Sequence, residues 1–199
     1  ELLVPEGFRA DLLLQWGDRL GSGRFGCNND FLAFTALDRD RGLLTVNFEF
    51  ISPRPWRAGY AEVIGDPPPF DALQRDLSSR GGSVDALGLA PDDPLRALVV
   101  AVAAAALEDL GIGVVEVQRF ADGSWHQRNG RFDRRFSGLC GLRQPSQRLR
   151  TSGPASAVFR RRQRLGYDDG LGDRVIGTFA NCAAGITPWG TVLSAVENI

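Results

Sequence analysis

The densest group of side chains that could do chemistry lies near the end of the chain. It combines the amide of Asn181, the thiol of Cys182 and the hydroxyl of Thr187 with the carboxylate of Glu197 and the amide of Asn198. A thiolate is a ligand for iron, copper or zinc, whereas carboxylate and amide oxygens suit calcium, magnesium or manganese. This segment therefore indicates a mixed metal site. The alternative is that Cys182 is a small buried residue in a glycine-rich loop.

Three other features are weaker candidates. The arginine run at 160–164 could bind phosphate or nucleic acid through its charge, but no aromatic residues alternate with it. A solvated loop is the simpler interpretation, and a nucleic acid partner is not favoured. His126 is the only histidine and follows Trp125, which is typical of a surface or packing residue. The glycines at 21–26 are not followed by a Lys-Ser/Thr pair, which argues against a phosphate loop.

Charge is segregated along a chain that contains no Lys, so all 23 positive charges are Arg. Residues 1–118 carry 10 Arg and 18 acids, residues 119–164 carry 12 Arg and 2 acids, and residues 165–199 carry 1 Arg and 4 acids. With 43% apolar and 24% charged residues, the composition is globular rather than disordered, and 3 Cys exclude a disulfide-rich scaffold. The middle segment could hold an anion.

The elements that must position these residues are mainly strands, because apolar and β-branched residues alternate over short stretches. The predicted strands are 2–14, 31–34, 43–50, 113–120, 124–126, 174–179 and 191–196. Polar turns at 38–42 and 122–123 make hairpins of their flanking strands, and the segment 180–190 forms the loop of the last hairpin.

Residues 97–107 are an uncharged stretch, and Asp92, Asp93 and Pro94 ahead of it are helix-start signals. The stretch has 11 residues against the roughly 20 that cross a bilayer, so we expect a helix and no membrane partner. We expect 52–94 to be a loop-rich insertion and 128–164 an Arg-rich irregular segment. The fold class is therefore mainly β with one or two helices, and a sandwich, a barrel or a propeller fits the strand spacing.

One stretch has a more specific likeness. Residues 177–193 read GTFANCAAGITPWGTVL, and Glu197-Asn198 follows. This resembles the signature of the PhoX family of alkaline phosphatases, G-T-x-N-N-C-A-x-G-x-T-P-W-G-T-x-L-T-x-E-E-N. Other segments resemble the family in the same order, and the resemblance covers nearly the whole chain. They are 4–8, 28–34, 42–50, 113–117, 122–125, 134–135 and 152–155.

The resemblance implies a hydrolase of small phosphate esters, with ferric iron and calcium as cofactors, on a β-propeller. Residues 1–199 would be the N-terminal part of that domain and form its first blades. The family likeness also implies twin-arginine export to the periplasm, although no signal peptide is present in the printed chain.

The same resemblance implies the roles of individual residues. Cys182 would bind iron through its thiolate, Glu197 would be a carboxylate ligand, and Glu49 would be a third contributor to the metal site. Thr187 and Trp189 would shape the loop, together with Asn181.

Three positions depart from the family pattern. Phe48 and Val158 stand where the family has His, and Val196 stands in place of one of two acids. Each change replaces a side chain that could support a metal by an apolar one. We therefore expect the chain to be incomplete or inactive by itself. The alternative is a non-enzymatic β scaffold that binds anions or nucleic acid through the Arg-rich residues 119–164.

Overall fold

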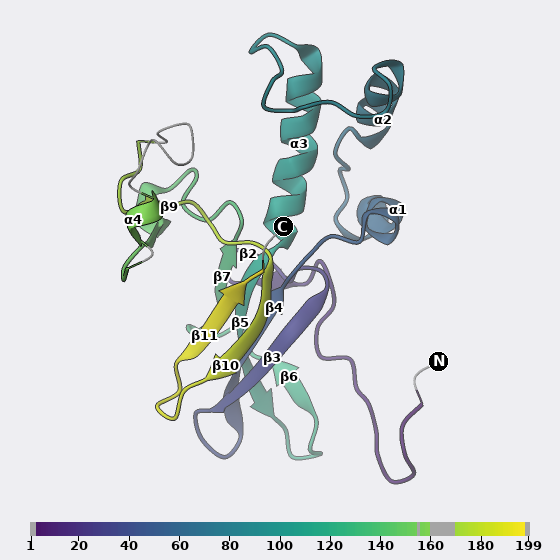
Figure 1. Cartoon of the computed structure of the whole chain (residues 1–199). Coiled ribbons are helices and arrows are strands. Elements are labelled where there is room, and N and C mark those ends of the chain that lie inside the picture. The colour runs from purple at the N-terminus through teal and green to yellow at the C-terminus, as the bar shows by residue number, and fades with distance from the viewer. Residues whose placement is uncertain (1–2, 155, 160–169, 198–199) are drawn as a thin grey trace.

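A computed structural model describes residues 3–154, 156–159 and 170–197 (Figure 1). It contains a five-stranded antiparallel sheet, a hairpin that lies over one face of this sheet, two further two-stranded antiparallel pairs, and helices at one end. In chain order the elements are β1 (Arg19–Leu20), β2 (Gly23–Arg24), β3 (Asn29–Ala36), β4 (Arg41–Phe48), α1 (Pro53–Val63), α2 (Phe70–Ser79), α3 (Pro94–Asp109), β5 (Gly111–Arg119), β6 (Trp125–Gln127), β7 (Arg134–Ser137), a 3-10 turn (Pro145–Gln147), β8 (Leu149–Arg150), α4 (Ser156–Phe159), β9 (Arg174–Val175), β10 (Asn181–Ile186) and β11 (Val192–Val196).

The main sheet has the strand order β3-β4-β5-β6, and β7 also pairs with β5. β6 binds one end of β5 and β7 binds the other, and every pair is antiparallel. The predicted hairpins at 31–50 and 113–126 are confirmed. They could be predicted because apolar residues alternate along a strand when the two faces of its sheet differ. The mainly β fold class is confirmed as well. None of the sheets closes on itself within the described residues.

The two faces of the sheet have different roles, as residues of β4 show. Val46 and Phe48 point into a buried core, which they form with Leu20, Phe25, Val115 and Val117. Thr45 and Asn47 alternate with them and are also buried, so they point to the opposite face. The hairpin of β10 and β11 covers that opposite face, where β10 contacts β3 and β4 (Figure 1).

The expectation that 52–94 is loop-rich is wrong, because α1 and α2 both lie in this segment. The prolines obscured the pattern, although a helix tolerates Pro in its first turn, where no intrahelical N–H bond is lost. Trp56 and Tyr60, one turn apart in α1, are buried and pack edge-on against Phe70 of α2. The described part of the chain thus has more than the one or two helices expected.

The predicted helix at 97–107 is confirmed as α3, which begins where expected. The side chain of Asp93 caps it by accepting a hydrogen bond of 2.9 Å from the backbone N–H of Leu95. Its last residue, Asp109, is fully buried and accepts hydrogen bonds from Arg24 Nε at 2.5 Å and Trp56 Nε1 at 2.7 Å. These bonds tie the helix end to β2 and α1. In the described residues, no helix is long and apolar enough to span a membrane.

Two predicted strands are wrong. Residues 3–14 form no strand in the structure; Leu13 and Leu14 instead pack on the core without a neighbouring strand to pair with. The predicted strand 174–179 is limited to β9, and the chain re-enters a sheet only at Asn181. Gly177 and Ala180 explain this break, because both have positive φ, 59° and 54°, which a strand does not accommodate. The predicted strand 191–196 is confirmed as β11.

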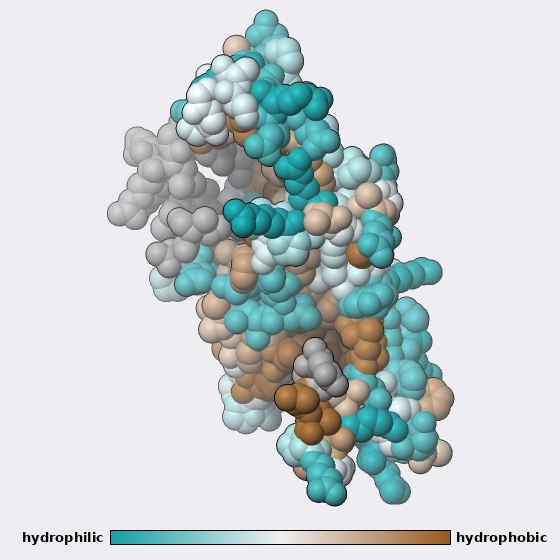
Figure 2. All heavy atoms as spheres, turned by 90° about the vertical axis from the view of Figure 1, so that its right-hand side faces the viewer, coloured by the Kyte–Doolittle hydropathy of each residue, from teal (hydrophilic) through white to brown (hydrophobic). Residues whose placement is uncertain are grey.

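The helical end and the sheet also differ at the surface. Figure 2 shows hydrophobic residues gathered over the sheet-bearing half of one face, whereas the helical end is mostly hydrophilic. The hairpin of β10 and β11 adds further exposed apolar side chains, which are Ile186, Trp189, Leu193 and Val196.

Candidate metal site

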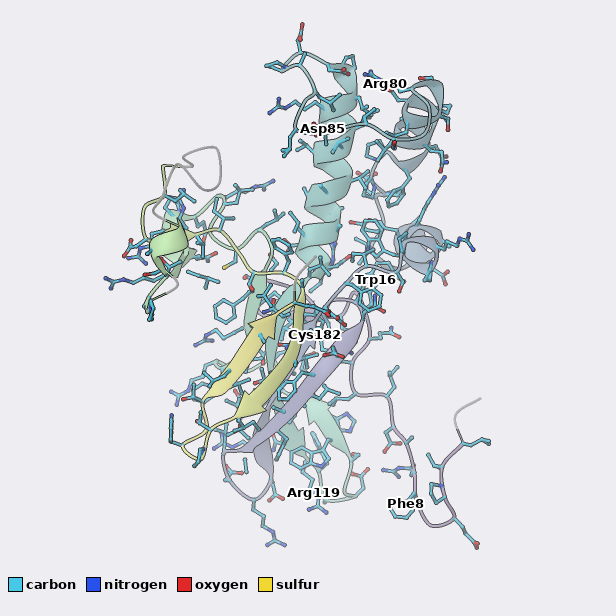
Figure 3. All side chains as sticks on the ribbon, viewed as in Figure 1. Phe8, Trp16, Arg80, Asp85, Arg119 and Cys182 are labelled. Carbon is cyan, nitrogen blue, oxygen red and sulfur yellow. The ribbon has the colours of Figure 1, made fainter. Side chains whose placement is uncertain are left out.

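Three metal-ligating side chains from distant parts of the sequence meet at one end of the sheet. Asp30 lies near the start of β3, Glu49 directly follows β4, and Cys182 is the second residue of β10. One ligand atom of each lies within 4.8 Å of the other two. Figure 3 shows Cys182 at the end of the sheet nearest the helices, with Arg119 at the opposite end. Glu49 and Cys182 are half-buried and Asp30 is exposed.

The donor set suits a cation. Hydrogen bonds to Asp30 and then to Glu49, together with desolvation, raise the pKa of the Cys182 thiol to about 11. Two carboxylates that crowd a thiol disfavour a third negative charge, and a bound cation reverses this effect. One soft sulfur and two hard carboxylate oxygens offer ligands to a transition metal and to calcium-like ions alike. The residues present therefore fit a metal.

Irregular strand pairing determines the direction of two of these side chains, those of Asp30 and Cys182. Between Asn29 and Leu32 the register of β3 against β4 shifts by one residue, and Asp30 lies within the shift. The register of β10 against β11 shifts between Asn181 and Ala184, and Cys182 lies within that shift. A β-bulge of this kind bends the strand and redirects a side chain, which regular alternation cannot do.

The same two segments share a second irregularity. Asn28 and Ala180 have φ of 48° and 54°, and each stands two residues ahead of a cluster member, Asp30 or Cys182. Ala in the left-handed region costs roughly 1–2 kcal/mol. Asn adopts the left-handed region more readily than Ala. The side chain of Asn28 also donates a hydrogen bond of 2.6 Å to the carbonyl of Phe50, which holds this conformation. Its own carbonyl accepts the N–H of Glu49 at 3.2 Å, which fixes the chain on both sides of the carboxylate.

The structure brings together some of the site residues predicted from sequence and not others. Cys182 and Glu49 meet, as predicted. Glu197 is exposed and outside the cluster, although its backbone N–H donates to the carbonyl of Ala180 at 2.9 Å. Its role as a ligand stays a prediction. Asp30 joins the cluster and was missed, because an acid at the start of a strand is ordinary and a bulge leaves no mark in the sequence.

The residues expected to shape the loop occupy different places. Asn181 is buried beside Cys182 and makes side-chain hydrogen bonds. Thr187 closes the turn between β10 and β11, since its Oγ1 accepts the N–H of Thr191 at 2.9 Å. Trp189 lies in the same turn and is 78% exposed.

The departures from the family pattern do not remove a cluster member. Phe48 points into the core on the face of the sheet opposite Glu49, where its ring packs edge-on against Phe25. Val196 is exposed. The side chain of Val158 and the arginine run at 160–164 lie outside the described residues. His126 is exposed, with its Nε2 2.9 Å from the hydroxyl of Ser124.

The fold and the cluster define a β-rich protein whose strand ends gather metal-ligating side chains. The chain matches the family described as alkaline phosphatase PhoX over residues 1–199, and it belongs to this family. The resemblance seen in the sequence is thus confirmed. No curated protein matches the chain.

The chain is similar to the solved structure of Pseudomonas fluorescens PhoX in complex with vanadate, a transition state analogue. The two share 27% sequence identity and superpose with a TM-score of 0.61. The match covers 96% of this chain but 29% of the other. The chain therefore spans less than a third of that relative.

Proposed function

We propose that Asp30, Glu49 and Cys182 form part of the metal centre of a PhoX-type phosphatase that hydrolyses small phosphate esters. The observation that carries this proposal is the convergence of the three ligand atoms within 4.8 Å in a chain that matches the family throughout. Following the family resemblance, Cys182 would hold ferric iron, and the carboxylates would hold iron or calcium. A bound cation stabilises negative charge on phosphoryl oxygens.

The chain's own residues contribute position and charge. Asp30 and Glu49 place two negatively charged oxygens beside the sulfur of Cys182, and the resulting negative potential attracts a cation to this end of the sheet. We keep Glu197 as a further carboxylate contributor. It follows Val196, which pairs with Asn181 next to Cys182.

Family membership also supports the broader proposals. We propose that the antiparallel sheets belong to the first blades of a β-propeller, and that the whole protein is exported to the periplasm by the twin-arginine route. The solved relative binds vanadate, a transition state analogue, and this supports a site for phosphoryl chemistry in the whole protein.

The alternative, anion binding by the Arg-rich segment 119–164, has less support. Several of its described arginines already have partners inside the molecule. Arg128 pairs with Glu116 at 3.0 Å and Arg150 with Asp173 at 3.2 Å. Arg135 is buried, and its guanidinium donates to the backbone carbonyls of Arg24, Glu108, Leu110 and Ile112. The charge of these arginines is partly neutralised by Glu116 and Asp173, or is buried, so less of it is free to bind a ligand.

Metal analysis of the purified chain, combined with hydrolysis of p-nitrophenyl phosphate, tests the proposal. We expect bound iron and calcium, and we expect Cys182→Ala to lose the iron. Cys140→Ala is the matched control, because Cys140 is also a free, partly buried thiol but lies outside the cluster. An unchanged metal content in Cys182→Ala, or a wild-type chain that takes up no metal, would contradict the proposed site even if some hydrolysis is measured.

A further inference from the structure

A directed chain of four side-chain hydrogen bonds ends on the backbone of Cys182. The hydroxyl of Thr178 donates to Asn181 Oδ1 at 3.0 Å, and Asn181 Nδ2 donates to Ser194 Oγ at 3.1 Å. Ser194 Oγ then donates to Asn47 Oδ1 at 3.1 Å. Finally, Asn47 Nδ2 donates to the carbonyl oxygen of Cys182 at 2.6 Å. Donors and acceptors run in one direction, so each bond polarises the next.

The last bond of this chain replaces one that the sheet cannot make. Asn181 pairs with Val196 and Ala184 pairs with Ser194, whereas Cys182 has no partner across the bulge. Its carbonyl is therefore held by the side chain of Asn47 from another sheet. Asn47 is fully buried, where an unsatisfied amide or carbonyl is costly.

The hairpin contacts this face of the sheet through β10, which lies against β3 and β4. A cavity of about 480 Å³ lies between the hairpin and the sheet, and it is lined on the two sides by residues that include Thr45, Thr178, Asn181 and Ser194. Because space remains between the hairpin and the sheet, the hydrogen-bonded chain adds to the packing contacts that join β10 to β4.

Asn47 also has a fixed relation to a second member of the cluster. It lies on β4, two residues before Glu49, which directly follows this strand, and β4 pairs with β3, which carries Asp30. One buried side chain therefore connects the strand that leads into Glu49 directly to the backbone of Cys182.

We propose that Asn47 is a positioning residue of the metal site, which sets Cys182 against Glu49 so that thiol and carboxylate are arranged before a metal arrives. This inference rests on the proposed function, namely that the cluster binds a metal. Ser194 supports Asn47 by orienting its amide, because Asn47 Oδ1 accepts the serine hydroxyl and Nδ2 is thereby turned to Cys182. Outer partners of this kind typically contribute about 10–100-fold to metal affinity.

Titration of the reduced full chain with Co²⁺ alone tests this inference, with the thiolate-to-cobalt charge-transfer absorption as the readout. We expect Asn47→Ala to weaken Co²⁺ binding by about 10–100-fold and to shift or abolish this absorption. Ser194→Ala should weaken binding by a smaller factor, and Ser194→Thr, which keeps a hydroxyl, should restore it. Thr45→Ala is the matched control, since Thr45 is a buried polar residue on the same face of β4 but outside the hydrogen-bonded chain.

The possible outcomes separate the two ideas. If wild-type binding depends on Cys182 and Asn47→Ala binds Co²⁺ with unchanged affinity and absorption, the inference is wrong and the proposed metal site stands. If wild-type absorption does not depend on Cys182, the proposed metal site is wrong and the inference fails with it. Equal losses in Asn47→Ala and Thr45→Ala would show a merely structural role. Should Asn47→Ala not fold, the two Ser194 variants decide the result.

Discussion

Asp30→Asn should change the stability of the protein in opposite directions with and without metal. In the metal-free protein, the charges of Asp30 and Glu49 lie within 4.8 Å of each other and repel. At that separation the repulsion is about 0.9 kcal/mol in a water-like dielectric and about 3.5 kcal/mol at an effective dielectric of 20. Because Asp30 is exposed, the lower figure applies, and we expect Asp30→Asn to stabilise the metal-free protein by about 1 kcal/mol.

Metal should reverse this order. At a cation concentration of about 100 times Kd, the wild-type chain gains about 2.7 kcal/mol of unfolding free energy. If loss of the charged ligand raises Kd about a hundredfold, Asp30→Asn gains only about 0.4 kcal/mol at the same concentration. With the cation, the unfolding free energy of Asp30→Asn should then be about 1.3 kcal/mol lower than that of the wild-type chain. Without metal it should be about 1 kcal/mol higher.

Urea unfolding followed by tryptophan fluorescence, once in EDTA and once in excess Co²⁺, measures both differences. Asp40→Asn is the control, because Asp40 lies in the turn at the other end of the β3–β4 hairpin and outside the cluster. It should stay within about 0.5 kcal/mol of wild type in both conditions. The reasoning would be refuted if Asp30→Asn were less stable than wild type in EDTA. It would also be refuted if Co²⁺ raised the unfolding free energy of Asp30→Asn as much as that of wild type.

Three further predictions concern the scaffold. Phe48→Ala should cost about 3–5 kcal/mol in urea unfolding, because it empties a fully buried position, whereas Phe8→Ala, at a residue 73% exposed, should cost no more than about 0.5 kcal/mol. Asp109→Asn removes the charge that neutralises Arg24 and should cost about 3–5 kcal/mol by the same measurement, and an unchanged midpoint would contradict a stabilising ion pair. Burial raises the pKa of the Cys27 thiol to about 12, against 9.0 for an ordinary thiol. The unfolded chain therefore loses this proton first, so stability should fall as pH rises from about 9 towards 12, and Cys27→Ala should reduce that slope.

Regular alternation is what made much of the sheet predictable. In β4 the apolar side chains of Val46 and Phe48 enter one core, and the run 43–50 therefore looks like a strand in the sequence. The helix at 97–107 was equally clear, since Asp93 caps it and Pro94 begins it. These features depend on neighbours in sequence, which is why local patterns suffice.

The elements that were missed depend on contacts between distant residues. The positive φ of Gly177 and Ala180 keeps β10 from beginning before Asn181. At Gly177 a Cβ would lie 2.1 Å from the carbonyl oxygen of Gly138, a contact that no local sequence pattern reveals. The candidate site was predictable to the extent that a motif marks it. Cys182 stood out as a thiol among oxygen ligands and Glu49 came from the family resemblance, whereas Asp30 lies within the bulge in β3.

The two bulges make the cluster separable from the scaffold that carries it. Each bulge is one surplus residue in a strand, so deleting Phe31 or Ala183 would keep the paired residues on both sides in register and change the backbone only beside Asp30 or Cys182. The hydrophobic core lies on the face of the sheet opposite the hairpin and contains neither deleted residue. The geometry of the candidate site can therefore be altered by a single deletion that leaves every residue of the buried core in place.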